Sequence, residues 1–190
     1  MMKLAKRLLI FIFLPITALI GIIVGVANYS IRDEKPGNSE FYETVIGIKL
    51  RPLRTVVSCD TAPWYGALDS AEFYVMLLPD EAFKAPARGY PKRMDYQTTH
   101  ELVEWHNGPQ SEKDRPVLSE GLGIPIRWLE QDHPGSAKDL SLLHSIPSLL
   151  DRADVHIAYV YAYGAGYVNR LALYILDPRN RYFYLVRFGI

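Results

Sequence analysis

The chain has 190 residues, of which 49% are hydrophobic and 22% charged, a composition that predicts one globular domain plus an additional segment. Its net charge is zero, but three of its 21 basic residues lie within the first seven positions, which leaves 18 basic against 21 acidic side chains in the remainder. A mildly acidic domain argues against nucleic acid as a partner, because phosphate binding requires a concentrated basic surface. The single cysteine, Cys59, excludes an internal disulfide and a cysteine-built zinc site.

The amino-terminal segment predicts a membrane helix. Leu8 to Ala27 contains no charged side chain, and a helix of that length spans about 30 Å, the thickness of a bilayer's hydrocarbon core. The basic cluster of Lys3, Lys6 and Arg7 before this run predicts a cytoplasmic amino terminus. We therefore expect residues 1–28 to form a basic tip and a signal-anchor helix in a bacterial inner membrane, with the domain in the periplasm or outside the cell.

Two further interpretations of this segment remain open. Gly25-Val26-Ala27 has the small residues of a signal-peptidase site, which would make the segment a removable signal peptide rather than an anchor. Gly21 and Gly25 have the spacing that lets two membrane helices pack closely, which would give a homodimer. Glycine is also common in membrane helices that do not associate in this way.

A polar tether over residues 29–40 and a domain over residues 41–190 follow. Strands are expected at residues 43–50, 53–59 and 72–78, with irregular chain at residues 60–70 and 84–96. A short helix is expected at residues 98–106, because Thr98 and Glu101 have capping-box spacing. Extended chain, interrupted by proline and glycine, is expected as far as Gln131. A second helix opens at Gly135, with Leu140 and Leu143 facing inward, and is interrupted near Pro147.

The last third of the chain predicts a meander of three antiparallel strands. The strands are expected at residues 155–163, 167–176 and 181–188, joined by a glycine-rich reversal at 164–166 and a type I turn at 177–180. The first strand has a face of small residues, on which the helix containing Leu140 is expected to pack. The fold class is therefore α+β: a transmembrane helix, then one domain with a mainly antiparallel sheet and two short helices.

The meander also contains the strongest signal of a protein interface. It holds seven of the thirteen tyrosines together with several arginines, and these two residue types dominate protein–protein hot spots, although tyrosine is also simply common in strands. Alternation along the closing strand places Tyr182, Tyr184, Val186 and Phe188 on a core face. The opposite face carries two arginines and is expected to be partly open, because burying unpaired guanidinium groups is very costly. The interface candidates are Phe183, Leu185, Arg181, Arg187 and Arg170.

Two groups of polar residues offer an enzymatic alternative. His100, Glu101 and Glu104 resemble part of a zinc-hydrolase helix motif, but the last position is Glu instead of His. Asp132 and His133 precede a Pro-Gly turn, where polar residues are ordinary. No nucleophile elbow or phosphate loop is present, so we expect no cofactor and no metal site.

The sequence thus predicts a non-catalytic, membrane-anchored module that binds or inhibits a protein partner outside the cytoplasm, such as an envelope-complex subunit or an immunity protein. The alternative is a membrane-anchored or secreted hydrolase, metal-dependent or not. The two differ in a structural expectation, since a hydrolase should gather its polar candidates in one concave pocket.

Overall fold

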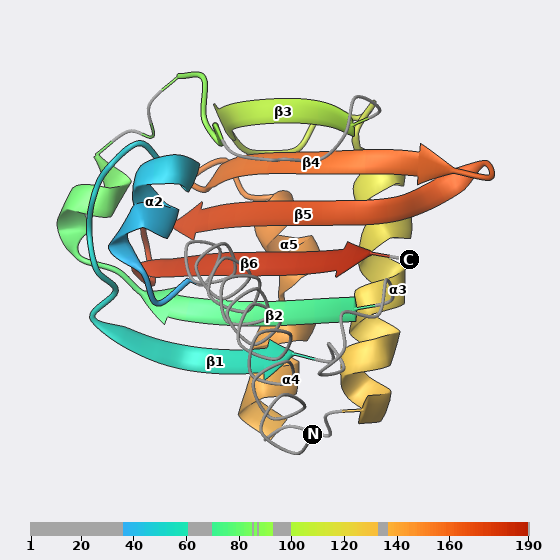
Figure 1. Cartoon of the computed structure of the whole chain (residues 1–190), viewed down its shortest axis with the longest axis horizontal. Coiled ribbons are helices and arrows are strands. Elements are labelled where there is room, and N and C mark those ends of the chain that lie inside the picture. Colours follow the sequence, from blue (N-terminus) through green and yellow to red (C-terminus); the bar gives the residue numbers. More distant parts are fainter. Residues whose placement is uncertain are drawn as a thin grey trace, which may run out of the picture.

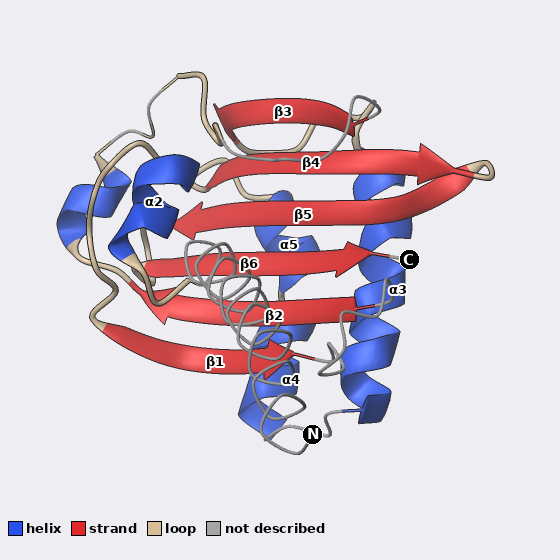
Figure 2. Cartoon of the chain, in the orientation of Figure 1, coloured by secondary structure: helices blue, strands red, loops and turns tan. Residues whose placement is uncertain are grey.

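A six-stranded antiparallel sheet organises the domain, with helices on both of its faces (Figures 1 and 2). The computed structural model describes residues 36–60, 70–84, 86, 88–92, 100–132 and 137–189. The strand order is β1-β2-β6-β5-β4-β3, so the last strand lies near the middle of the sheet. In chain order the strands are β1 (Arg54–Asp60), β2 (Ser70–Leu77), β3 (His100–Asn107), β4 (His156–Gly164), β5 (Tyr167–Asp177) and β6 (Tyr182–Gly189).

The carboxy-terminal meander is confirmed. β4 pairs with β5 and β5 with β6, all antiparallel, and the Asp177–Tyr182 pair closes the second hairpin. The strands predicted at residues 53–59 and 72–78 are also confirmed, as β1 and β2, and the α+β class with a mainly antiparallel sheet holds. Runs of β-branched and aromatic residues bounded by turn residues explain why these strands were readable from the sequence.

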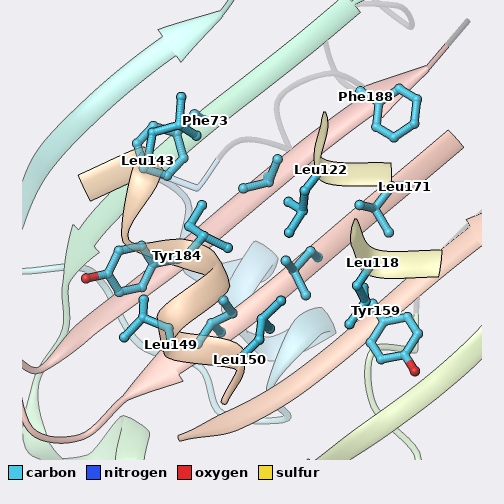
Figure 3. Packing of buried hydrophobic residues seen from close by; sticks show 14 of the residues in the cluster. Phe73, Leu118, Leu122, Leu143, Leu149, Leu150, Tyr159, Leu171, Tyr184 and Phe188 are labelled. Atoms are coloured by element: carbon cyan, nitrogen blue, oxygen red, sulfur yellow. The ribbon is translucent and has the colours of Figure 1, made fainter. Parts of the chain in front are cut away.

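Three helices cover one face of the sheet. They are α3 (Arg115–Asp132), α4 (Ala137–His144) and α5 (Ile146–Leu150), and all three lie behind the sheet in Figure 1. In Figure 3, Leu118 and Leu122 of α3 project toward the sheet residues Tyr159 and Leu171, and all four belong to one buried cluster. The same cluster includes Leu143 of α4, which confirms the inward position predicted for it. The predicted interruption of this helix also occurs, at Ser145, two residues before Pro147.

The opposite face is covered by α2 (Ser39–Val45) and the short 3-10 helix η1 (Asp80–Phe83). The strand predicted at residues 43–50 is therefore wrong. Asn38 caps α2 by accepting a hydrogen bond from the Glu40 amide at 3.3 Å, and the buried side chains of Phe41, Tyr42, Val45 and Ile46 repeat with helical spacing. Ile46, Ile48 and Leu50 do alternate with Gly47 and Lys49 as in a strand, but the helical spacing of the buried residues 41–46 decides the structure.

Helix α2 also decides what the small face of β4 packs against. Ala158 of β4 is buried in the same cluster as Phe41 and Tyr42 of α2. Leu143 of α4 lies instead with Ile157 and Tyr159, on the large face of the strand. The predicted packing of the Leu140 helix on the small face is therefore wrong. The helix that packs against Ala158 is α2, which precedes the sheet in the chain.

Two further element predictions are wrong. Residues 100–107 form the outer strand β3 in place of a helix. Residues 115–132 form α3 in place of extended chain, because Val117, Leu118, Leu122 and Leu129 are buried at helical spacing against the sheet. Pro125 lies inside this helix and removes a single backbone hydrogen bond, which the buried apolar face outweighs.

The predicted anchor over Leu8 to Ala27, its glycines and the possible cleavage site lie outside the described residues. Among the helices that are described, none is both long and apolar enough to cross a bilayer.

Candidate functional site

Large apolar side chains reach the surface mainly at one corner of the sheet. Four such side chains are exposed in the described part of the chain, and three of them belong to β3 and the β4–β5 hairpin. Leu102 of β3 is 46% exposed, Tyr163 of β4 is 50% exposed and Tyr167 of β5 is 41% exposed. The fourth, Leu53, lies just before β1, at the opposite edge of the sheet. We call Leu102, Tyr163 and Tyr167 the corner surface.

The hairpin that presents two of these residues extends past the neighbouring strands (Figure 1). Its tip requires left-handed backbone at Ala165 (φ 53°) and Gly166 (φ 87°), and glycine adopts this conformation at no steric cost. The hairpin is held to α3 close to its tip, because the Val168 amide donates a hydrogen bond to Glu120 Oε1 at 3.2 Å. This hydrogen bond therefore helps to fix the position of the hairpin that carries the exposed Tyr163 and Tyr167.

Tyr163 is the outermost of three tyrosines in contact along β4. Tyr159 and Tyr161 are stacked with ring centroids 6.1 Å apart, and Tyr161 meets Tyr163 edge-on at 5.5 Å. Tyr159 is fully buried and Tyr161 nearly so, whereas half of Tyr163 is exposed. The row leads from the core on the α3 side to the surface, so the exposed ring has a rigid aromatic neighbour.

Polar contacts fix this row against the outer strand and the start of α3. The Tyr161 hydroxyl donates a hydrogen bond of 2.5 Å to Glu101 Oε2 on β3. The Tyr159 hydroxyl is buried near the Asp114 carboxylate but forms no hydrogen bond of regular geometry within the described residues. Burial raises the pKa of both phenols, and the acidic neighbours Asp114 and Glu101 raise it further, so both are neutral at physiological pH.

The pKa of Asp114 is shifted in the opposite direction from the pKa values of the two phenols. Partial burial opposes its ionisation, but the hydroxyls of Ser111 and Tyr159 and the nearby Lys113 and His106 outweigh burial, and its pKa is lowered. His106 lies edge-on to Tyr159 with centroids 6.3 Å apart, and its Nδ1 is 3.0 Å from the Glu104 carbonyl. Of the polar contacts in this region, the hydrogen bond from Tyr161 to Glu101 joins β4 to β3.

Part of the outer side of β3 is hydrogen-bonded to residues 89–90. The Trp105 amide donates to the Tyr90 carbonyl at 3.3 Å, and the Gly89 amide donates to Glu104 Oε2 at 3.1 Å. No other described segment is hydrogen-bonded to the outer side of His100 to Val103. This half of the strand adjoins the hairpin, since Leu102 is paired with Val160 and His100 with Ala162.

The face of β6 that was expected to be open is closed. Phe183 and Leu185 are both 0% exposed, because α2 and its neighbours pack over them. The predicted alternation is right, since Tyr184, Val186 and Phe188 lie in the cluster on the other face. The error lies in treating the arginines as evidence of an open face: Arg187 is bound to Glu72, its cross-strand partner on β2, by a bond of 3.1 Å from its Nε.

The remaining two interface candidates lie apart from each other. Arg181 has a left-handed backbone (φ 59°) in the β5–β6 turn and pairs with Asp80 at 2.8 Å. Arg170 is half-buried on β5, opposite Ala162 and Gly189. A role for either in binding a partner stays a prediction. The five candidates do not form one surface, because two of them are buried in the core.

Two of the polar residues considered for catalysis, Glu101 and Glu104, form hydrogen bonds within the domain. Glu101 accepts its hydrogen bond from Tyr161, while Glu104 accepts one from the loop at Gly89, and both carboxylates lie on the outer strand. The capping role expected of Glu101 is wrong, because no helix begins there. Asp132 ends α3, whereas His133 lies outside the described residues. Among the described residues, no three histidine, cysteine or acidic side chains are close enough to share a metal ion.

A comparison of the chain with known protein families, curated proteins and solved structures gives no match to any of them.

Proposed function

We propose that this chain is a non-catalytic protein-binding or inhibitory module, anchored in the bacterial inner membrane by Leu8 to Ala27, with its domain outside the cytoplasm. An envelope-complex subunit and an immunity protein are both of this type. The observation that supports the proposal best is that three of the four exposed large apolar side chains of the described chain belong to β3 and the β4–β5 hairpin, at one corner of the sheet, where they are divided between its two faces. Exposed apolar side chains concentrated in one place mark interaction sites more often than scattered ones do.

The arrangement favours an extended segment of the partner as the element that binds. A strand added beside residues 100–103 would contact both faces of the sheet through its alternating side chains. Leu102 shares a face with Val160, and Tyr163 shares the opposite face with Tyr161, so such a strand would meet an apolar side chain on each side. Tyrosine supplies a large rigid contact at a low cost in side-chain entropy.

The hydrolase alternative has no observation in its favour. Two of its candidate residues, Glu101 and Glu104, are hydrogen-bonded to Tyr161 and to the Gly89 amide. The proposal therefore rests on a binding surface.

Replacing both Tyr163 and Tyr167 by alanine is expected to leave the fold intact and to weaken partner binding by at least tenfold. Both side chains are about half exposed, so their removal leaves no core cavity, whereas loss of two hot-spot aromatics typically costs more than this factor. The measurement is quantitative co-purification from membranes of the full-length chain and its variants.

The matched control is Leu53→Ala, which removes an apolar side chain that is 58% exposed from the opposite edge of the sheet. It should retain the co-purifying partner at the wild-type level. Equal losses in the control and the double variant would show that the corner surface has no special role.

The membrane topology has its own test. Alkaline phosphatase fused after Ile190 should be active, and a reporter that functions only in the cytoplasm should be inactive, because Lys3, Lys6 and Arg7 hold the amino terminus inside. The opposite pattern would contradict the localisation. A mature chain that starts at Asn28 in the soluble fraction would show that the apolar segment is a cleaved signal peptide.

A further inference from the structure

One arginine of the sheet differs from its neighbours in having no carboxylate partner. Four arginines lie in β5, β6 and the turn between them. Three of them form ion pairs, namely Arg179 with Asp154, Arg181 with Asp80 and Arg187 with Glu72. The fourth, Arg170 on β5, forms no ion pair and no side-chain hydrogen bond with any residue that the structure describes.

Arg170 is nevertheless half-buried. Its cross-strand neighbours are both small, Ala162 on β4 and Gly189 on β6. A guanidinium group that has no protein partner must stay hydrated, because burying an unpaired charge is very costly. We therefore expect the carbon stem of Arg170 to lie along the sheet, with the charged end reaching water beside these small residues.

The same face of the sheet carries two of the three side chains of the corner surface. Leu102 is paired with Val160, and Arg170 with the residue two positions further along β4, so Leu102 and Arg170 lie on one face. Tyr167 is paired with Gly164, again two positions further along β4, and the extra residue at the register shift belongs to β5. The unpaired arginine therefore shares a face with an exposed leucine and an exposed tyrosine, at the end of the sheet away from α2 (Figure 1).

This combination selects an acidic group on a protein. Tyrosine and arginine dominate protein–protein hot spots, and the fork of a guanidinium group matches the two oxygens of a carboxylate. Arg187 lies on the same face, since it is paired with Ala172 two positions along β5 from Arg170, but Glu72 already occupies it. Arg170 is thus the arginine of this face that a partner can use.

We propose that Arg170 binds the side-chain carboxylate of an aspartate or glutamate in the partner segment that occupies the corner surface. The carboxylate lies over Ala162 and accepts hydrogen bonds from the guanidinium group, while an apolar side chain next to it contacts Leu102 or Tyr167. The inference rests on the proposed function and adds the chemistry of the partner, which is an acidic residue adjoining an apolar one.

The test uses short random peptides displayed on phage and selected for binding to the full-length chain in lipid nanodiscs. Clones that also bind empty nanodiscs or the Tyr163→Ala/Tyr167→Ala variant are removed, so the remaining peptides need the corner surface. These peptides are expected to share an aspartate or glutamate near an apolar residue. In calorimetric titration, replacing that acidic residue by its amide should weaken binding about tenfold or more, the factor for one charge-assisted hydrogen bond.

Arg170→Met keeps the carbon stem and removes the charge, and Arg170→Gln takes its place if the first variant does not fold. The acidic peptide and its amide should bind this variant equally. Its urea unfolding midpoint should equal or exceed that of the wild type, because the charge has no partner in the described fold. Arg127→Met is the matched control, since Arg127 is exposed on α3 and also forms no ion pair within the described chain. It should keep the full preference for the acidic peptide.

Two results would overturn the inference while the proposed function stands. One is a set of peptides that need the corner surface but have no acidic preference, or that bind the wild type equally as acid and as amide. The other is a lower unfolding midpoint in Arg170→Met, which would mean that the guanidinium group is bound within the fold. The absence of any peptide that depends on the two tyrosines would instead contradict the proposed function itself.

Discussion

Phe183→Ala is expected to lower the free energy of unfolding by about 3–5 kcal/mol, the range for a large aromatic removed from a core. Phe183 is 0% exposed and packs edge-on against Phe41 and Tyr42 of α2, with ring centroids 5.9 and 5.5 Å away. Its loss therefore leaves a cavity between the sheet and α2 and removes two favourable ring contacts. The measurement is urea unfolding of the purified chain, followed by tryptophan fluorescence, since Trp105 lies beside this cluster.

Two variants serve as controls for this result. Phe183→Leu keeps most of the volume and should lose much less stability. Tyr184→Ala, from the other face of β6, should be destabilised to a similar degree as Phe183→Ala, because Tyr184 is only 2% exposed. If Phe183→Ala retained wild-type stability while Tyr184→Ala lost it, α2 would not cover this face, and the face would again be a candidate interface.

Asp177→Ala is expected to cost about 3 kcal/mol or more, because it removes one partner of a buried ion pair. The Asp177 side chain is fully buried and is bound by two nitrogens of Arg152, at 2.7 and 3.2 Å. It also accepts hydrogen bonds from the Arg179 amide and the Asn180 side chain, which shape the β5–β6 turn. The variant therefore loses the hydrogen bonds that shape the β5–β6 turn. It also loses the ion pair that joins this turn to Arg152, which follows α5. Urea unfolding again gives the measurement.

The comparison with two milder variants locates the effect. Asp177→Asn keeps the shape of the side chain and some of its hydrogen bonds, so its loss should be smaller. Asp154→Ala removes the second carboxylate on Arg152, but this residue is exposed, so its unfolding midpoint should change little. A loss in Asp154→Ala as large as that in Asp177→Ala would mean that burial of Asp177 is unimportant.

The sequence was sufficient for elements whose local pattern and tertiary environment agree. The meander is the clearest case, because its strands are rich in β-branched and aromatic residues and Asp177 and Pro178 form a strong turn signal. The predictions failed where a short pattern fits two structures. Residues 100–107 have a capping-box pattern before them and still form a strand, because pairing with β4 decides the outcome.

The helix α3 shows a second kind of failure. Glycine and proline lower intrinsic helix propensity, and their number in residues 115–132 suggested extended chain. The spacing of Leu118, Leu122 and Leu129 was the better guide, since burial of this face outweighs the propensity of individual residues. The helix propensity of individual residues is therefore a weak predictor of secondary structure for a segment that buries an apolar face against a sheet.

The candidate sites were predictable only in part. The tyrosines of the meander were recognised as an interface signal, and the position of Tyr163 and Tyr167 beside the glycine-rich reversal could have identified them as the exposed pair. The closing of the β6 face could not be read from β6 alone, because it depends on a helix about 140 positions earlier in the chain.

The position of β6 in the sheet has a consequence for biosynthesis. This strand is synthesised after all the other described strands, yet it lies between β2 and β5, and the bond from Arg187 to Glu72 joins residues 115 positions apart. Until Tyr182–Gly189 has left the ribosome, the β1–β2 hairpin has no neighbour, and an isolated hairpin is at best marginally stable. The sheet is therefore completed only when Tyr182–Gly189 has been synthesised and inserted between β2 and β5.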